Sequence, residues 1–449
     1  MLKILAACLL FTLTIGVFAQ NQTDNSARAQ SFIAALAAKD FSRAYGFFGG
    51  EITSKLPAEG LPTLWASITA QVGEFKRQGR VIKTSLGGGE KITIVCEFEK
   101  SSVAVSSVFD DGGKIQGFFF EDAKKFDAGA PVYETPKYAD VNLFEEKEMT
   151  IGAGEWALPA TLTMPKSKTN VAAVVLVHGS GANDRDETHV NPANKVFKDL
   201  AWGLASKGVA VLRYDKRSLV HGRKLAAKKD FTVNEETVDD ALLAVELLRK
   251  TPNVNAKNIF VLGHSLGGYV IPRIGERDAR IAGFVNFAGA TRPLEDMILE
   301  QNAYFATLDG AVSPAEQKQL DELKKTVAKI KSLKETDKNS GEFYFGAYPA
   351  YYIDLQNYNP PKAAARLKQP MLVLQGESDY QVTMTDFANW KNALGSRKNV
   401  VFKSYPNLTH AFMESLGGKP SPQDYDKTNH VSETVIGDIA AWILKTARK

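Results

Sequence analysis

A serine between two glycines lies where a short apolar strand is expected to lead into a helix. Residues 259–262 are apolar and precede Gly263-His264-Ser265-Leu266-Gly267. Glycines permit a sharp turn that exposes the serine hydroxyl, and the Leu266 N–H at the helix start would face an anion formed there. Isolated pentapeptides of this form also occur by chance in ordinary loops. The flanking strand and helix favour a nucleophilic role for Ser265.

A serine nucleophile needs a general base, normally a histidine that a carboxylate holds in place. In sheets with this kind of turn the expected chain order is serine, acid, histidine. The apolar run at 371–375 is followed by Gly376-Glu377-Ser378-Asp379, which offers two carboxylates. We predict that Asp379, a few residues past the glycine, is the acid. Glu377 is the competing candidate and is expected to be a turn residue.

Only two of the six histidines, His410 and His430, follow both the serine and the acid. His410 lies in a loop that directly leaves the strand expected at 400–405. His430 lies near the start of the last expected helix, where a surface or capping role is the simpler interpretation. The sequence therefore predicts His410 as the base.

An oxyanion needs a second backbone donor, which in such sheets comes from the loop after an earlier strand. The run at 172–177 leads into a loop with Gly179 and Gly181, and these glycines let the backbone approach a substrate carbonyl closely. We predict that the backbone N–H groups of Ser180 and Leu266 are the two donors.

Several short apolar runs are continuous rather than alternating, which indicates strands buried on both faces of a parallel sheet. They occupy residues 172–177, 209–214, 259–263, 281–287 and 371–375. Helical patterns separate them, including an apolar stripe from Val238 to Leu248 for which Asn234 is a candidate N-cap. An antiparallel hairpin is expected at 149–164. Residues 143–449 are therefore predicted to form one α/β domain with a mostly parallel sheet.

An insertion is expected at about 291–361 of this domain. It contains an amphipathic helical pattern at 314–334, followed by aromatic residues that include Phe343, Phe345 and Tyr351. A helical cap that lines an acyl or aromatic pocket is the preferred interpretation, and ordinary packing is the alternative. For the charged clusters at 184–186 and 215–217, an ion-pair network at the rim of the site and a solvated surface remain equally open.

Residues 21–122 have a different pattern, with helical periodicity up to about residue 87 and strand alternation afterwards. Asp110-Asp111-Gly112-Gly113 marks a hairpin turn, and Cys96 lies on the apolar face of an alternating strand. These features predict a small α+β domain, in which Cys96 is a core residue. Residues 123–142, with glycine and prolines, are predicted to be a linker.

Residues 1–19 contain Lys3, a short apolar stretch and Ala19 before Gln20, a pattern typical of a secretory signal peptide. The apolar stretch is shorter than the roughly 20 residues that a membrane anchor requires. We therefore expect a secreted or periplasmic protein that is free of the membrane after cleavage. Cleavage would remove Cys8 and leave Cys96 as the sole cysteine, which excludes an intramolecular disulfide.

The composition is that of a globular chain of 449 residues with a net charge of +4 and no basic run. This charge gives no reason to expect binding to nucleic acid. The sequence has no cysteine cluster and no HExxH spacing, so no metal site is predicted. It does not indicate an oligomeric state.

Together these motifs make residues 143–449 resemble the α/β-hydrolase superfamily, in particular bacterial carboxylesterases and serine-peptidase-like hydrolases. The carrying segments are His178-Gly179-Ser180-Gly181, Arg213-Tyr214-Asp215-Lys216-Arg217 and Gly263-His264-Ser265-Leu266-Gly267-Gly268. The resemblance implies hydrolysis of small carboxylic esters through Ser265, Asp379 and His410, with no metal or organic cofactor. The segment at 21–122 resembles the small domains related to nuclear transport factor 2 and ketosteroid isomerase.

Three functions stay open at this point. A carboxylesterase is the leading hypothesis. A peptidase, amidase or thioesterase would use the same three side chains. A binding protein with a vestigial hydrolase domain is the third, and the intact motifs argue against it.

Overall fold

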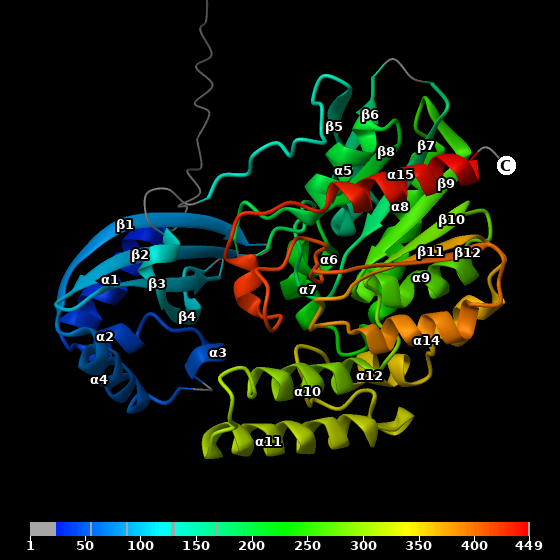
Figure 1. The fold of residues 1–449 in the computed structure, drawn as a ribbon. Coiled ribbons are helices and arrows are strands. Elements are labelled where there is room, and N and C mark those ends of the chain that lie inside the picture. The colour runs from blue at the N-terminus through cyan, green and yellow to red at the C-terminus, as the bar shows by residue number, and fades with distance from the viewer. Residues whose placement is uncertain are drawn as a thin grey trace, which may run out of the picture. The chain divides into compact units, whose positions relative to one another are not determined.

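A computed structural model describes residues 24–53, 56–86, 89–110, 112–126, 131–166, 169–189 and 191–447 (Figure 1). The chain divides into two compact units, Met1–Asp127 and Ala128–Lys449. The predicted signal peptide at 1–19 lies outside the described residues. No helix in the described ranges is both long enough and apolar enough to cross a bilayer.

The first unit is the predicted α+β domain, but the helical pattern expected up to about residue 87 is wrong for its last part, because residues 75–86 form a strand that pairs with residues 89–98. Its helices are α1 (Asn25–Ala37), α2 (Phe41–Tyr45), α3 (Gly50–Thr53) and α4 (Gly60–Val72), followed by the short η1 (Ala123–Phe126) after the sheet. The strands β1 (Phe75–Leu86), β2 (Gly89–Phe98), β3 (Ser102–Phe109) and β4 (Ile115–Asp122) form an antiparallel sheet in chain order. Cys96 packs in the core against this unit's apolar helix residues, and burial raises the pKa of its thiol to about 12. The thiol is therefore protonated at neutral pH.

The second unit contains an eight-stranded sheet of order β12-β11-β10-β9-β7-β8-β6-β5. The strands β7 (Val171–Val177), β8 (Ala210–Tyr214), β9 (Val254–His264), β10 (Gly283–Phe287), β11 (Met371–Gly376) and β12 (Val400–Tyr405) run parallel. The hairpin of β5 (Phe144–Ile151) and β6 (Leu158–Pro165) adds two antiparallel strands at one edge. The predicted fold class, a mostly parallel α/β sheet after a small α+β domain, is confirmed.

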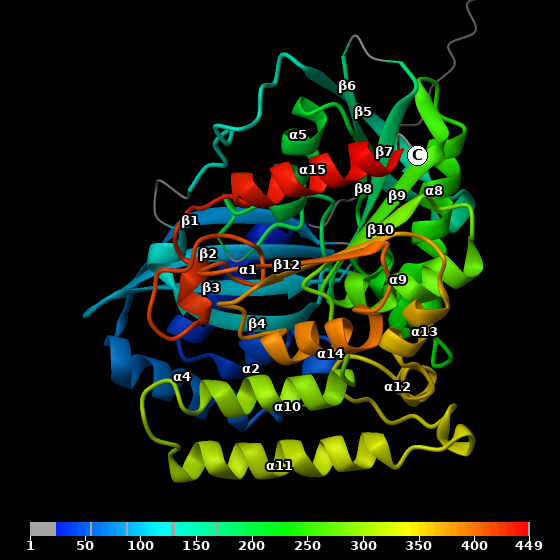
Figure 2. The ribbon, with the colours of Figure 1, turned by 45° about the vertical axis from the view of Figure 1, so that its right-hand side comes forward.

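Helices cover both faces of this sheet, as the continuous apolar strands predict (Figure 2). Val174 and Leu176 of β7 belong to the core under α5 (Val196–Ser206) and α15 (Glu433–Ala447). Val175 and Val177 belong to the core under α8 (Asp239–Arg249), α9 (Leu266–Arg277) and α14 (Met384–Leu394). Because alternate residues of one strand enter different cores, every residue of β7 is buried.

The insertion after β10 is helical. It contains α10 (Leu294–Phe305), α11 (Pro314–Lys331), η4 (Glu335–Asp337), α12 (Pro349–Gln356) and the start of α13 (Pro360–Arg366). Ser313 caps α11 through a reciprocal capping box with Glu316. The helices α10 and α11 lie side by side in Figures 1 and 2.

The expected N-cap role of Asn234 is wrong. Asn234 starts a single π-helical turn, η3 (Asn234–Val238), and α8 begins only at Asp239. Its carboxamide instead donates to Asp354 at 3.2 Å and accepts from Arg273 at 3.3 Å. These tertiary partners compete with the local capping bond. The remaining short helices before it are α6 (Arg217–Val220) and α7 (Gly222–Ala226).

Candidate active site

Ser265 occupies the turn between β9 and α9 in a conformation that non-glycine residues rarely adopt. Its φ is +54° and its ψ is −115°. A Cβ on Gly263 would lie 2.4 Å from the carbonyl carbon of Gly267, and a Cβ on Gly267 would lie 2.2 Å from the Val177 carbonyl oxygen. Only glycine fits at these two positions, because real Cβ atoms do not approach other atoms so closely. The tight turn thus places Ser265, in a strained backbone conformation, at the end of β9, a central strand of the sheet.

Asp379 and His410 form a buried hydrogen-bonded pair. His410 Nδ1 lies 2.6 Å from Asp379 Oδ2. The other carboxylate oxygen accepts the backbone N–H groups of Gln381 at 2.7 Å and Val382 at 2.9 Å. Gln375 Nε2 donates to Oδ2 at 2.9 Å. Donors therefore surround the carboxylate, which orients it toward the imidazole.

This arrangement assigns the His410 proton to Nδ1, because that nitrogen faces a carboxylate acceptor. No hydrogen bond within the described ranges occupies His410 Nε2, so this nitrogen can accept a proton. Gln381 and Val382, whose amides hold Asp379, line the same cavity as Ser265. The loop that holds Asp379 therefore reaches the cavity of Ser265, and the His410 ring lies 4.6 Å, between ring centroids, from that of His264, the residue before the serine.

The two competing candidates lie elsewhere. Glu377 is exposed, and its carboxylate accepts from Ser404 Oγ at 2.7 Å. His430 Nδ1 lies 3.1 Å from the carboxylate of Asp199 on α5. Neither residue forms an ion pair or hydrogen bond with His410 in the described structure: the carboxylate that His410 faces is that of Asp379.

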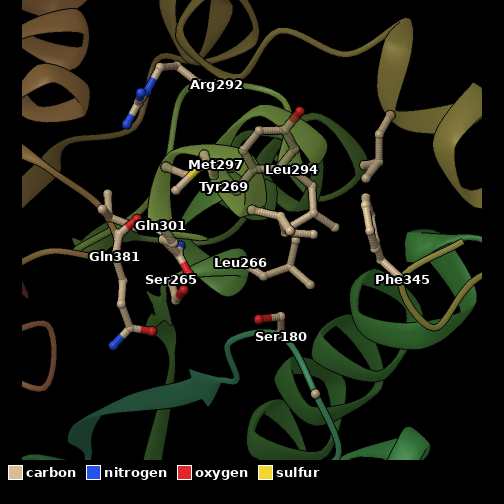
Figure 3. A pocket seen from close by; sticks show the side chains of 15 residues that line it. Ser180, Ser265, Leu266, Tyr269, Arg292, Leu294, Met297, Gln301, Phe345 and Gln381 are labelled. Atoms are coloured by element: carbon tan, nitrogen blue, oxygen red, sulfur yellow. Dashed lines mark hydrogen bonds between the residues drawn. The ribbon is translucent and has the colours of Figure 1, made fainter. Parts of the chain in front are cut away.

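The predicted oxyanion loop passes directly against the nucleophile. A Cβ on Gly179 would lie 3.1 Å from the Ser265 Cβ, and Gly181 has a φ of +92°. Ser180 and Leu266 line the cavity that Ser265 faces (Figure 3). The structure therefore brings both predicted donor residues to the serine.

A second histidine–carboxylate pair, absent from the sequence prediction, lies beside the first. His264 Nδ1 is 2.9 Å from Glu187 Oε2, and its Nε2 is 3.1 Å from the backbone carbonyl oxygen of His410. Both partners are acceptors, so the ring must donate through both nitrogens, as an imidazolium does. The His264 and His410 ring centroids are 4.6 Å apart.

The electrostatics of this second pair agree with its geometry. Burial by itself would raise the pKa of the Glu187 carboxyl, but His264 and His178 hold that pKa well below its usual range. Burial by itself would lower the pKa of His264. The Glu187 carboxylate has the larger opposite effect, so the pKa of His264 is raised above its usual value. Glu187 Oε1 also accepts the Gly179 N–H at 3.2 Å. This ion pair thus links the oxyanion loop to the backbone of His410.

The two charged clusters form an ion-pair network rather than a solvated surface. Arg185 donates to both oxygens of Asp215, through Nε at 3.1 Å and Nη2 at 2.9 Å. Arg213 Nε donates to Asp186 at 3.0 Å. In the sequence, Glu187 stands out only because it directly follows the 184–186 cluster. That position does not reveal its partners.

A cavity of about 310 Å³ opens over Ser265 (Figure 3). Arg292 is its only charged lining residue within the described ranges, and the guanidinium is already paired with Glu300 at 2.5 Å and Asp386 at 2.8 Å. Other lining residues are apolar or uncharged, among them Met297, Gln301, Gln381 and Leu355. The cavity is therefore suited to a neutral group.

A second cavity of about 330 Å³ adjoins the first. Ser180, Gly181, Leu266, Leu294 and Phe345 line both of them. The second cavity has a largely aromatic wall from the insertion and from the segment before η3, namely Phe231, Phe343, Tyr348, Tyr351 and Tyr352. The insertion thus lines a pocket beside the serine, as expected.

Within the ranges that the structure describes, no group of three or more histidine, cysteine, aspartate or glutamate side chains is placed to hold a metal ion.

Comparison with known families divides the chain as the fold does. Residues 168–415 match the family described as serine aminopeptidase, S33. Residues 29–118 match a family described as "Protein of unknown function (DUF3887)".

The esterase EstD of Thermotoga maritima is 36% identical over 414 residues, which are 92% of this chain and 94% of EstD. Among solved structures, Est1E of Butyrivibrio proteoclasticus is 16% identical, with a TM-score of 0.44, over 67% of this chain and 99% of its own. An esterase of Pyrococcus furiosus is also 16% identical, with a TM-score of 0.42, over 70% of this chain and 96% of its own.

Proposed function

The chain belongs to the α/β-hydrolase family that includes the serine aminopeptidases and EstD, and we propose that it is a serine carboxylesterase acting through an acyl-enzyme on Ser265. The observation that carries the proposal is the buried Asp379–His410 pair at 2.6 Å beside a serine held at positive φ. A relative named as an esterase over almost the whole chain supports the ester as substrate.

In this mechanism His410 Nε2 takes the Ser265 hydroxyl proton as Oγ attacks the ester carbonyl carbon. Asp379 keeps the other proton on Nδ1 and stabilises the imidazolium that forms. The carbonyl oxygen becomes an oxyanion, which accepts hydrogen bonds from the backbone N–H groups of Ser180 and Leu266. His410 then returns its proton to the departing alkoxide, and the acyl group stays on Ser265. Water repeats the sequence and releases the carboxylic acid.

The two cavities suggest how an ester sits. Because the reacting carbonyl carbon must lie at Ser265, the acyl and alcohol portions extend in different directions from it. We assign one portion to each cavity, with Leu266, Leu294 and Phe345 among the residues that line both. The charged side chain that lines each cavity, Arg292 in the first and Glu236 in the second, is already paired with an opposite charge, which favours uncharged esters of modest size.

An aminopeptidase is the second candidate, which the family description raises. An aminopeptidase must hold the charged α-amino group of a peptide, and a free carboxylate is the usual partner for an ammonium. The described lining of the first cavity contains no acidic side chain. The acid of the second cavity, Glu236, is already paired with Lys216 at 2.9 Å and Tyr351 at 2.7 Å. These observations favour the ester.

The test combines labelling with substrates. A fluorophosphonate should label the wild-type protein and not Ser265→Ala, and the variant should lose turnover of p-nitrophenyl acetate. Faster cleavage of aminoacyl p-nitroanilides than of matched p-nitrophenyl esters would contradict the esterase proposal. Glu377→Gln is a matched control, because Glu377 is an exposed carboxylate two positions from the acid.

We further propose that the protein is exported and that residues 1–19 are its leader. The basic start and short apolar stretch support this proposal. Intact-mass analysis of protein recovered from a periplasmic extract should give a chain that begins at Gln20. A chain that retains Met1 and stays with the cytosol would contradict it.

A further inference from the structure

Lys216 is a fully buried lysine whose place in the reaction the mechanism above does not explain. It follows β8, and 1% of its surface is exposed. Its Nζ donates to the carbonyl oxygen of Gly179 at 2.8 Å and lies 2.9 Å from Glu236 Oε1. Burying an ammonium group is costly, so a buried lysine that bonds a loop carbonyl calls for a reason.

The carbonyl that Lys216 binds belongs to the same peptide unit as the Ser180 N–H. A peptide unit is planar, with its C=O and N–H pointing in opposite directions. Holding the Gly179 oxygen therefore fixes the direction of the Ser180 N–H, the proposed oxyanion donor. A cation at the carbonyl end also polarises the amide and strengthens its N–H as a donor.

The same lysine connects this peptide to the cap. Glu236 Oε1 forms the ion pair with Lys216. Its other oxygen, Oε2, accepts a hydrogen bond from the Tyr351 hydroxyl at 2.7 Å. Tyr351 lies on α12 of the insertion and lines the second cavity. All three side chains are buried, with exposed fractions of 1%, 7% and 6% for Lys216, Glu236 and Tyr351. A continuous path of two hydrogen bonds and one ion pair thus runs from the cap to the oxyanion loop.

We propose that Lys216 is a positioning residue for the oxyanion hole and that Glu236 and Tyr351 couple this hole to the cap. The proposal rests on the proposed function, because it assigns to the Ser180 N–H the role of an oxyanion donor. It predicts that the cap's contact with substrate affects transition-state stabilisation as well as substrate binding.

The first test is Lys216→Met, together with the charge-balanced double variant Lys216→Met/Glu236→Gln. Loss of one oxyanion donor lowers kcat by about 100-fold or more in comparable sites. We expect kcat to fall by about 100-fold in both variants, with KM changed by less than about threefold. The inhibition constant of a trifluoromethyl ketone, which forms a tetrahedral adduct, should rise with the loss in kcat/KM.

Two comparisons separate positioning from a merely structural role. The double variant leaves no unpaired buried charge and should regain thermal stability without regaining kcat. Arg249→Met removes another largely buried ion pair, with Asp278 at 2.5 Å, and should lower stability while kcat stays unchanged. If the double variant recovers wild-type kcat, or if the ketone binds all variants equally, the proposal is wrong.

The cap link is tested by Tyr351→Phe, which removes only a hydroxyl group. We expect kcat to fall by about tenfold, which corresponds to the lower end of the free energy of one hydrogen bond to a charged group. Tyr405→Phe is the control, because its hydroxyl donates to Asp438 at 2.8 Å away from the cavities. An unchanged kcat in Tyr351→Phe would remove the cap from the proposal.

Fluorophosphonate labelling distinguishes failure of this proposal from failure of the proposed function. If the wild-type protein does not react, the serine mechanism itself is wrong. If the wild-type protein reacts and Lys216→Met keeps wild-type kcat, only the role of Lys216 is wrong.

Discussion

Two of the buried histidine–carboxylate pairs in the described structure, His410–Asp379 and His264–Glu187, lie side by side and differ in the use of the second ring nitrogen. In both pairs Nδ1 faces the carboxylate, at 2.6 Å for His410–Asp379 and 2.9 Å for His264–Glu187. The Nε2 of His264 is bound to a backbone carbonyl at 3.1 Å. Within the described ranges, the Nε2 of His410 has no such partner. The same two residue types therefore give a candidate base in one pair and a fixed ion pair in the other.

The comparison shows that a histidine–carboxylate contact does not identify a catalytic base. A base needs a nitrogen free to accept a proton, next to the group that loses it. His264 has neither nitrogen free and instead joins the oxyanion loop, through Glu187, to the carbonyl of His410. We interpret the second pair as a support for the first.

Removal of His410 should give the largest effect. In His410→Ala, the proposed base is lost, and kcat should fall by about 10⁴- to 10⁶-fold, the range seen when one member of a serine–histidine–aspartate triad is removed. Steady-state hydrolysis of p-nitrophenyl acetate measures it. A loss of less than about 100-fold would mean that His410 is not the base.

Asp379→Asn should be nearly as severe, because an amide cannot accept the Nδ1 proton in the same way and favours the wrong tautomer of His410. The corresponding change in a serine protease lowers kcat by about 10⁴-fold. We expect a loss of similar order in kcat and a loss of about 1–3 kcal/mol in the free energy of unfolding, because the new NH2 group would face one of the donors around the carboxylate. Burst kinetics and urea unfolding together test this, and wild-type kcat would contradict the assignment.

Glu187→Gln should lower the stability of the protein more than it lowers kcat. It leaves His264 without its ionic partner in a buried site, where breaking an ion pair costs about 3 kcal/mol or more. We expect that loss in the free energy of unfolding from urea titration, and a fall in kcat of only about tenfold, because the base itself remains. If kcat fell as far as in Asp379→Asn while the stability stayed unchanged, the two pairs would not have separate roles.

The smallest effect is a pH dependence of stability that belongs to the second pair. The lowered pKa of Glu187 gives a contribution that is present above its ordinary value of 4.5 and is lost as the pH falls through the folded-state pKa. The raised pKa of His264 gives one that is present below 6.5 and is lost as the pH rises through its own folded-state pKa. The unfolding free-energy difference between wild type and Glu187→Gln should therefore be greatest between about pH 4.5 and 6.5.

A difference that is flat from pH 3 to 9 would contradict the charged state of His264. The measurement needs denaturant titrations of both proteins in the same series of buffers.

Much of this site follows from local sequence. Ser265, Asp379 and His410 each come directly after a strand whose apolar run is visible in the sequence, and parallel strands bring their carboxyl ends to one edge of a sheet. Glycine at 263 and 267 has a local steric reason. These positions could be predicted because each depends on its own segment and on the order of segments.

The supporting residues could not be predicted in this way. Glu187 meets His264 across 77 positions, and Lys216 meets Gly179 across 37. Lys216 lies in the 215–217 cluster and Glu187 directly follows the 184–186 cluster, and such charged clusters look the same in sequence whether they are solvated or buried. Asn234 has the right type for a cap, and tertiary partners on α9 and α12 take its side chain instead. The strand expected at 281–287 begins two residues later, at Gly283.

The two adjoining cavities, both lined by Leu266, Leu294 and Phe345, bear on the fate of the proposed acyl-enzyme. An alcohol leaves its cavity while the acyl group is still attached to Ser265, so the emptied space is where the next nucleophile enters. Any small alcohol that fits this space competes there with water. In alcohol-rich solution the protein should therefore transfer acyl groups and make new esters, and the size of the emptied cavity sets which alcohols can be acceptors.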